Sequence, residues 1–174
     1  LELDNIGKMP PSKEFLTYYR DNLESAMRKE TEHFFGHILK ENLPPREFLA
    51  ANYSFLNREL AEHYGMSGLN GKHFGKVSLP NTARGGILGH GSFLTASANG
   101  VDTSPVVRGI YVMNKLLDYT PPPPPDDVPA IEPDVRGATT LREQLIKHRA
   151  DATCAQCHNK IDPVGFALEN YDAI

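Results

Sequence analysis

Cys154-Ala155-Gln156-Cys157-His158 is the stretch of this sequence that says most about its structure and function. It holds the only two cysteines in 174 residues, and a histidine follows the second cysteine directly. The spacing C-x-x-C-H is typical of covalent attachment of c-type haem. Each thiol can add to one haem vinyl group, and one short helical turn reaches both. We therefore predict one covalent haem on Cys154 and Cys157, with His158 as the proximal iron ligand.

Two other chemistries use the same residues. A C-x-x-C pair can be a redox dithiol, although a dithiol does not require the histidine and no βαβ pattern surrounds this pair. The pair can also be half of a zinc site, which needs four ligands. Cys154, Cys157, His158 and His148 would supply them. We favour haem over both alternatives.

Composition and charge argue against several classes of function. The net charge is −4, and acidic and basic residues are interspersed along the chain. Since there is no basic block, nothing indicates binding to nucleic acid. No apolar run reaches the roughly 18 residues that a membrane helix needs, so we expect no membrane span in this segment.

The start of the chain bears on where the protein works. The sequence begins Leu1-Glu2-Leu3-Asp4, with neither an initiator Met nor a signal peptide. Cytochromes of the c type are normally assembled outside the cytoplasmic membrane. We therefore expect a segment of a longer exported protein, located in the periplasm or at the cell surface.

Helix signals occur at residues 12–40, 45–64, 104–117 and 140–150, whereas strand patterns are few. Ser12 is the predicted N-cap of the first helix, and Gly36 is expected to kink or end it. Thr140 and Glu143 fit a capping box at the start of the last helix. Asp162-Pro163 is expected to turn the chain. These signals predict a mainly α fold.

We divide the chain into two parts. Residues 1–65 form a helical N-terminal segment of a larger domain, and residues 66–174 form a helical haem c domain with long irregular connections rich in glycine and proline. Within the second part, residues 120–133 form a proline-rich strap, because Pro121–Pro125 favour polyproline II at roughly 3.1 Å per residue. We interpret the strap as a stiff spacer, since nothing basic flanks it as ligands of proline-binding modules often require.

A longer pattern extends in both directions from the cysteines. Residues 161–172 read Ile-Asp-Pro-Val-Gly-Phe-Ala-Leu-Glu-Asn-Tyr-Asp. Further matching segments precede them in order, at residues 53–61, 84–88 and 103–109, the proline run, and His148-Arg149. Each piece alone is weak, but together residues 50–174 resemble the planctomycete-type cytochrome c domain proteins.

The resemblance implies a haem protein that forms part of a very large, exported, multidomain chain of largely unknown function. Its expected role is electron transfer, with a redox partner protein or adjacent domains of the parent chain as partners. No substrate follows from the resemblance, so we assign no catalytic residue and leave open whether the segment is an enzyme.

The distal iron ligand must lie upstream of the cysteines, because neither Met nor His follows His158. Three candidates are His148, which occurs at this place in the family's pattern, Met113 in a predicted helix, and His90 among glycines. Glycine lets a backbone approach a flat cofactor closely. Met66 and His73 are weaker candidates, and an open iron site is the other alternative.

Other side chains are expected to hold the haem. Arg108 and Arg84 are predicted to pair with the haem propionates, because guanidinium groups bind carboxylates in a bidentate way. Phe166 is expected to cover the haem face. Electron transfer is the favoured function. The alternatives are a haem enzyme with an open iron site, of a peroxidase-like or oxidising kind, and a zinc-binding interaction module.

Overall fold

The computed structural model describes residues 3, 6, 11–79, 84–98, 100, 103–123 and 140–171. The chain divides into two compact units, which are described separately. Unit 1 contains residues 1–103 and 170–174, and unit 2 contains residues 104–169. Helices dominate both units, which confirms the mainly α fold. The predicted domain boundary after residue 65 falls inside unit 1, and the predicted domains themselves stay a prediction.

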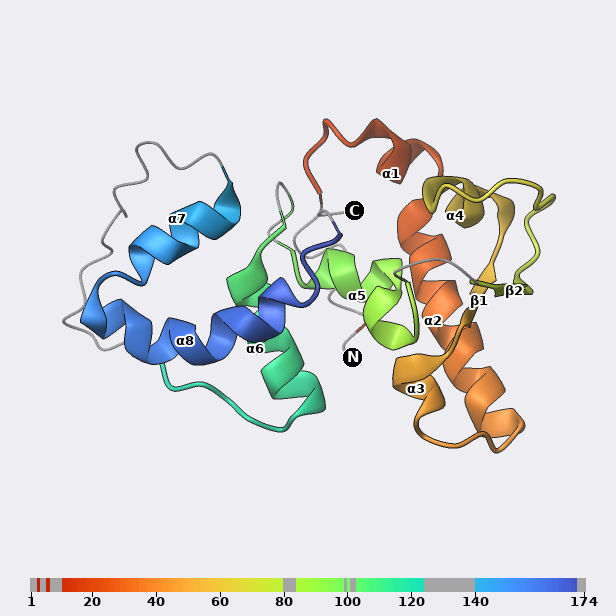
Figure 1. Ribbon diagram of the computed structural model, residues 1–174. Coiled ribbons are helices and arrows are strands. Elements are labelled where there is room, and N and C mark those ends of the chain that lie inside the picture. The colour runs from red at the N-terminus through yellow and green to blue at the C-terminus, as the bar shows by residue number, and fades with distance from the viewer. Residues whose placement is uncertain are drawn as a thin grey trace. The chain divides into compact units, whose positions relative to one another are not determined.

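Unit 1 is built around one long helix, α2, as Figure 1 shows. Its elements in chain order are α1 (Leu16–Arg20), α2 (Leu23–Lys40), α3 (Glu47–Ala50), β1 (Tyr53–Leu56), α4 (Arg58–His63), β2 (Gly75–Ser78), the 3-10 helix η2 (Ile87–Gly89) and α5 (Gly91–Ala96). The strands β1 and β2 pair antiparallel, with Tyr53 opposite Ser78. β1 packs against α2, as do α1, α4 and α5.

The core of unit 1 consists of two apolar clusters along α2. The first contains Tyr18, Leu23, Ala26, Met27, Leu56, Leu60 and Ala61. The second contains Phe34, Ile38, Ala51 and Tyr53. Since both clusters draw side chains from successive turns of α2, burial of one helix face holds the short surrounding elements in place.

The first predicted helix is interrupted at a different residue from the one expected. Asn22 adopts a left-handed conformation, with φ of 52°, between α1 and α2. Gly36 lies inside α2, which continues to Lys40, so the prediction that Gly36 ends the helix is wrong. Phe34 and Ile38 on either side of it are buried, and their packing keeps the backbone helical.

The prediction of one helix over residues 45–64 is wrong in the middle of that range. The structure has α3, then β1, then α4 in this range. Tyr53 and Leu56 of β1 are buried in separate apolar clusters, and pairing with β2 satisfies the backbone.

Unit 2 contains three described helices, α6 (Pro105–Leu116), α7 (Leu141–His148) and α8 (Ala152–Phe166), seen in Figure 1. Ser104 caps α6 through a hydrogen bond from the Val107 N–H. Thr140 and Glu143 form the predicted capping box of α7, with both reciprocal hydrogen bonds present. Among the described residues, no helix is both long and apolar enough to cross a bilayer.

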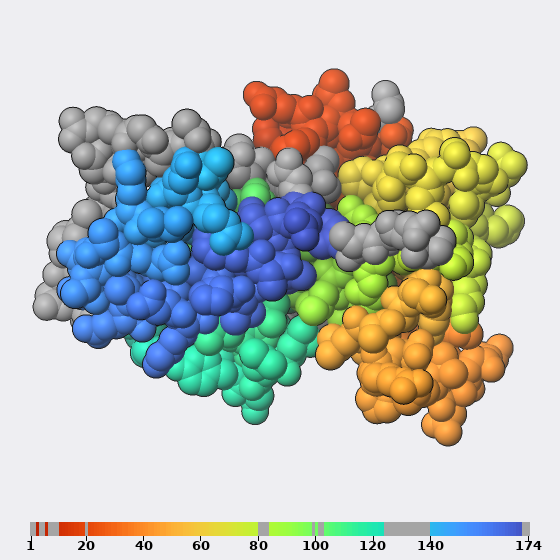
Figure 2. Space-filling view, viewed as in Figure 1, coloured from red at the N-terminus to blue at the C-terminus, as the bar shows by residue number. Residues whose placement is uncertain are grey.

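The helices α6 and α8 pack closely because glycines stand where they cross. A Cβ atom at Gly109 would overlap the carbonyl oxygen of Ile161, and one at Gly165 would overlap that of Pro105. Figure 2 shows α7 and α8 together on the visible face of unit 2. The close approach fixes α8, and with it every residue that α8 carries.

Pro163 does not end α8, so the predicted turn at Asp162-Pro163 is wrong. The helix runs through Pro163 to Phe166. A proline inside a helix loses one backbone hydrogen bond. Here Ile161, Asp162 and Gly165 are all buried, and this packing holds the helical path. Of the predicted strap, residues 120–123 are described, and residues 124–133 lie outside the described residues.

Candidate functional site

The C-x-x-C-H stretch lies in the first two turns of α8. Asp151 caps this helix, and its carboxylate accepts hydrogen bonds from the N–H groups of Thr153 and Cys154. Those bonds lower the pKa of Asp151. Both cysteines are free thiols, Cys154 buried and Cys157 half-buried. The spacing i, i+3, i+4 puts Cys154, Cys157 and His158 on one helix face.

A buried carboxylate holds the ring of His158. Nδ1 of His158 lies 2.9 Å from Oδ1 of Asp162, one turn further along α8. Asp162 is fully buried, whereas the His158 side chain is 19% exposed. Because a carboxylate only accepts hydrogen bonds, Nδ1 is the donor, and in the neutral ring Nε2 is the atom with the lone pair. Nε2 has no hydrogen-bond partner among the described residues, so it is the nitrogen available to a metal.

His148 lies directly against His158. The two ring centroids are 4.7 Å apart, and the rings meet edge to face at 73°. His148 is the last residue of α7. The direct contact leaves no space for a porphyrin between the rings, so a distal role for His148 requires α7 to move away from α8.

Met113 lies on α6 and is 7% exposed. It lines a small cavity, of about 50 Å³, together with Cys157, Tyr119, Pro121, Pro122, Gln156, Lys160 and Ile161. The start of the proline run therefore lies beside the second cysteine. Pockets for small ligands and cofactors are usually about 300–1,000 Å³. The donor residues fit haem, but room for it requires the strap or α7 to move.

Two further predicted haem contacts are also in unit 2. Arg108 is completely buried, and its Nη1 donates a hydrogen bond of 3.1 Å to the Leu168 carbonyl oxygen just beyond the end of α8. Phe166 is the last residue of α8, and the Arg142 guanidinium stacks on its ring at 4.1 Å. Arg108 thus contacts the residues just after α8, and Phe166 lies at the C-terminal end of α8 itself.

His90 lies in the interior of unit 1. It is 3% exposed, its Nδ1 is 2.9 Å from Oγ1 of Thr31, and its ring packs edge-on against Phe34. Burial lowers the pKa of His90; Arg84 lowers it further, and Glu30 opposes the shift. The imidazole is therefore held neutral as part of the unit 1 core.

Arg84 also belongs to unit 1. Its Nη1 donates a 2.8 Å hydrogen bond to the Gly89 carbonyl oxygen, and its guanidinium lies 3.9 Å from the centre of the Tyr64 ring. Unit 2 thus brings together most of the predicted site residues, namely Cys154, Cys157, His158, His148, Met113, Arg108 and Phe166. Arg84 and His90 belong to unit 1.

The part of the chain that the structure describes contains no group of three or more His, Cys, Asp or Glu residues placed to hold a metal ion. The zinc alternative therefore has no preformed set of ligands there. Sequence reasoning missed the role of Asp162, although its spacing of four residues from His158 was a usable signal.

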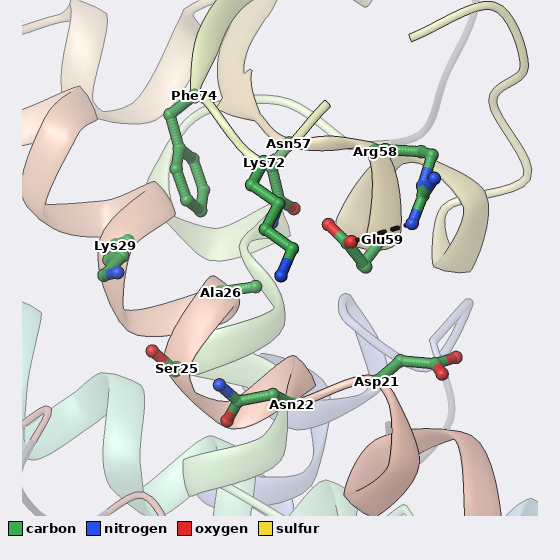
Figure 3. Close-up of a pocket in the computed structure, with 10 residues that line it drawn as sticks. All are labelled: Asp21, Asn22, Ser25, Ala26, Lys29, Asn57, Arg58, Glu59, Lys72 and Phe74. Atoms are coloured by element: carbon green, nitrogen blue, oxygen red, sulfur yellow. Dashed lines mark hydrogen bonds and ion pairs between the residues drawn. The ribbon is translucent and has the colours of Figure 1, made fainter. Parts of the chain in front are cut away.

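A hollow with a volume of about 460 Å³ lies in unit 1. Figure 3 shows Lys72 reaching into it above Ala26, with Asn22 below and Glu59 beside it. Arg58 and Glu59 form an ion pair of 3.1 Å on its wall. No cysteine or histidine lines it, so it is separate from the chemistry of the cysteine pair.

Two family models match the chain. PSCyt3, described as a protein of unknown function (DUF1588), matches residues 84–174. PSD4, described as a protein of unknown function (DUF1592), matches residues 1–66. Because the first match covers more than half of the chain, the chain belongs to the PSCyt3 family. No curated protein and no solved structure matches it.

By name, PSCyt3 and PSD4 are both planctomycete-type cytochrome c domain families. This confirms the resemblance at the level of the family, and neither description assigns a function. Because the two matches cover separate parts of the chain, they also support a multidomain parent protein.

Proposed function

We propose that unit 2 carries one covalently attached haem and serves electron transfer within a larger exported protein of the periplasm or cell surface. The observation that carries the proposal is one face of α8 with two free thiols and a histidine whose Nδ1 is held by a buried carboxylate. The family name agrees with a cytochrome c domain. Bound haem would supply an iron that alternates between Fe(II) and Fe(III).

Each residue on this face has a separate task. The thiols of Cys154 and Cys157 would add to the two vinyl groups of the haem, with sulfur bonding to one vinyl carbon and the thiol proton moving to the other. His158 offers Nε2 to the iron, and Asp162 keeps the proton on Nδ1. Redox partners are adjacent domains of the parent chain or a separate protein.

The experiment is mass spectrometry of the denatured chain after expression with haem-maturation machinery. We expect the mass of the chain plus one haem, together with a c-type absorption spectrum. The double variant Cys154→Ala/Cys157→Ala should have the bare mass, as should wild type expressed without the machinery. Wild type that keeps its bare mass in a maturation-competent host would contradict the proposal.

The distal ligand is expected to come from unit 2. We predict that either His148→Ala or Met113→Ala changes the spin state of the ferric haem and opens the iron to cyanide. His90→Gln should leave the spectrum unchanged, because His90 is packed inside unit 1. If His90→Gln changes the spin state and the other two variants do not, the assignment to unit 2 is wrong.

The hydrogen bond between Asp162 and His158 also suits the alternative of a haem enzyme, because a strong proximal donor assists reactions at an open iron site. Carbon monoxide and cyanide binding to the wild-type protein separates the two functions. Slow or absent binding supports electron transfer, whereas rapid binding to both oxidation states supports an enzyme.

A further inference from the structure

The Asp162 carboxylate is a feature of unit 2 that covalent attachment of haem does not require. Two thioethers and one histidine suffice for attachment, yet a fully buried carboxylate lies 2.9 Å from Nδ1 of that histidine. A buried charge needs partners that offset the cost of leaving water. Both partners of Asp162 lie close to the cysteine pair in the chain, namely His158 itself and Arg149.

We propose that Asp162 and Arg149 are positioning residues that set the donor strength of His158 and so fix the reduction potential of the bound iron. The inference rests on the proposed function. Nothing in the family descriptions assigns a role to either residue.

Asp162 acts on His158 in two ways. Its hydrogen bond fixes the tautomer and the ring orientation, which leaves Nε2 as the donor atom. Its negative charge beside Nδ1–H also strengthens the donation of electron density from Nε2 to a bound iron. A stronger donor stabilises Fe(III) relative to Fe(II), so the carboxylate lowers the reduction potential.

Arg149 acts in the opposite direction. Its Nε lies 3.5 Å from Oδ2 of Asp162, an ion pair rather than a hydrogen bond. Both atoms are buried, and neither has a hydrogen-bond partner among the described residues. The guanidinium therefore draws negative charge away from His158 and limits the effect of Asp162. Asp162 therefore lowers the reduction potential of the bound iron, and Arg149 raises it.

Packing around Asp162 strengthens its effect on His158. The neighbours of Asp162 along α8, Ile161 and Gly165, press against Gly109 and Pro105 of α6. The carboxylate is thus held by packing as well as by its partners. Fixed charges act more strongly in a dry interior than in water.

The first test needs no haem. In the unmodified chain at alkaline pH, nitrogen NMR of the His158 ring should show the Nδ1–H tautomer. The Nε2–H tautomer would overturn the inference, because Nδ1 would then have no proton to donate to Asp162. Since this measurement is made on the chain without haem, its failure is distinct from a failure of haem attachment.

The second test uses the protein with covalent haem. Asp162→Asn keeps the size of the side chain and removes its charge. We expect the equilibrium ratio of Fe(III) to Fe(II) at a fixed potential to fall at least tenfold, a rise in midpoint potential of about 59 mV for one electron. The iron–histidine stretching frequency should fall as well, measured by resonance Raman of the reduced haem in the His148→Ala or Met113→Ala background that opens the iron.

Arg149→Gln should shift both readouts in the opposite direction, and it keeps the inference testable if Asp162→Asn folds poorly. Lys115→Gln is the matched control, because it removes one positive charge from an exposed position on α6 of the same unit. Its shift should be clearly smaller than that of Arg149→Gln. Wild-type potential and stretching frequency in Asp162→Asn, or equal shifts in Arg149→Gln and Lys115→Gln, would overturn the inference.

Discussion

Replacing Gly165 by alanine is expected to lower the free energy of unfolding of unit 2 by about 3 kcal/mol. A Cβ atom at this position would overlap the carbonyl oxygen of Pro105, which is backbone and has no rotamer to change. The helices α6 and α8 would have to separate. Gly109→Ala should act similarly, because its Cβ would overlap the carbonyl oxygen of Ile161.

The measurement is hydrogen exchange of the α6 and α8 amides, which follows unit 2 separately from unit 1. Gly36→Ala is the matched control. It lies in α2, and a Cβ atom there meets nothing within 4 Å. That variant should be stabilised by up to about 1 kcal/mol, because alanine is the better helix former. Equal protection in Gly165→Ala and wild type would show that the helices do not cross this closely.

The predicted cap at Ser12 is wrong, since α1 begins after Phe15 without a side-chain cap hydrogen bond. The capping box predicted from Thr140 and Glu143 is present, because it depends on residues three positions apart. The spacing of Cys154, Cys157 and His158 likewise places them together on α8. Such signals act within one or two helical turns, so a single sequence contains all the information they need.

Features that depend on distant contacts were not predictable in this way. The helix α8 continues through Pro163 because Gly165 and Ile161 pack against α6, which lies about 50 residues earlier. β1 forms because β2 pairs with it across an intervening helix. In the candidate site, Arg149 reaches Asp162 from the end of α7. Local sequence preferences predict none of these contacts, because the contacts join residues far apart in the chain or on different helices.

A buried polar network in unit 1 joins α2 to β1, to the residue that ends α4 and to the start of α5. Glu30 is 1% exposed, and its two carboxylate oxygens accept hydrogen bonds of 2.6 Å from Ser54 Oγ and Tyr64 Oη. The Gly91 N–H donates to Tyr64 Oη at 2.7 Å. Burial, followed by the charge of Glu30, raises the pKa of Tyr64 well above its ordinary value. The phenol therefore stays protonated and remains a donor.

Glu30→Ala is expected to lower the free energy of unfolding of unit 1 by about 3 kcal/mol, because it leaves two buried hydroxyl groups without an acceptor at about 1–3 kcal/mol each. Glu30→Gln should cost less, since one amide oxygen can still accept a hydrogen bond. Urea unfolding combined with hydrogen exchange of the α2 amides measures both. Glu32→Ala, an exposed position on the same helix, should change stability by no more than about 0.5 kcal/mol. If Glu30→Ala and Glu32→Ala are equally stable, the network does not hold unit 1 together, and the apolar clusters along α2 carry its stability alone.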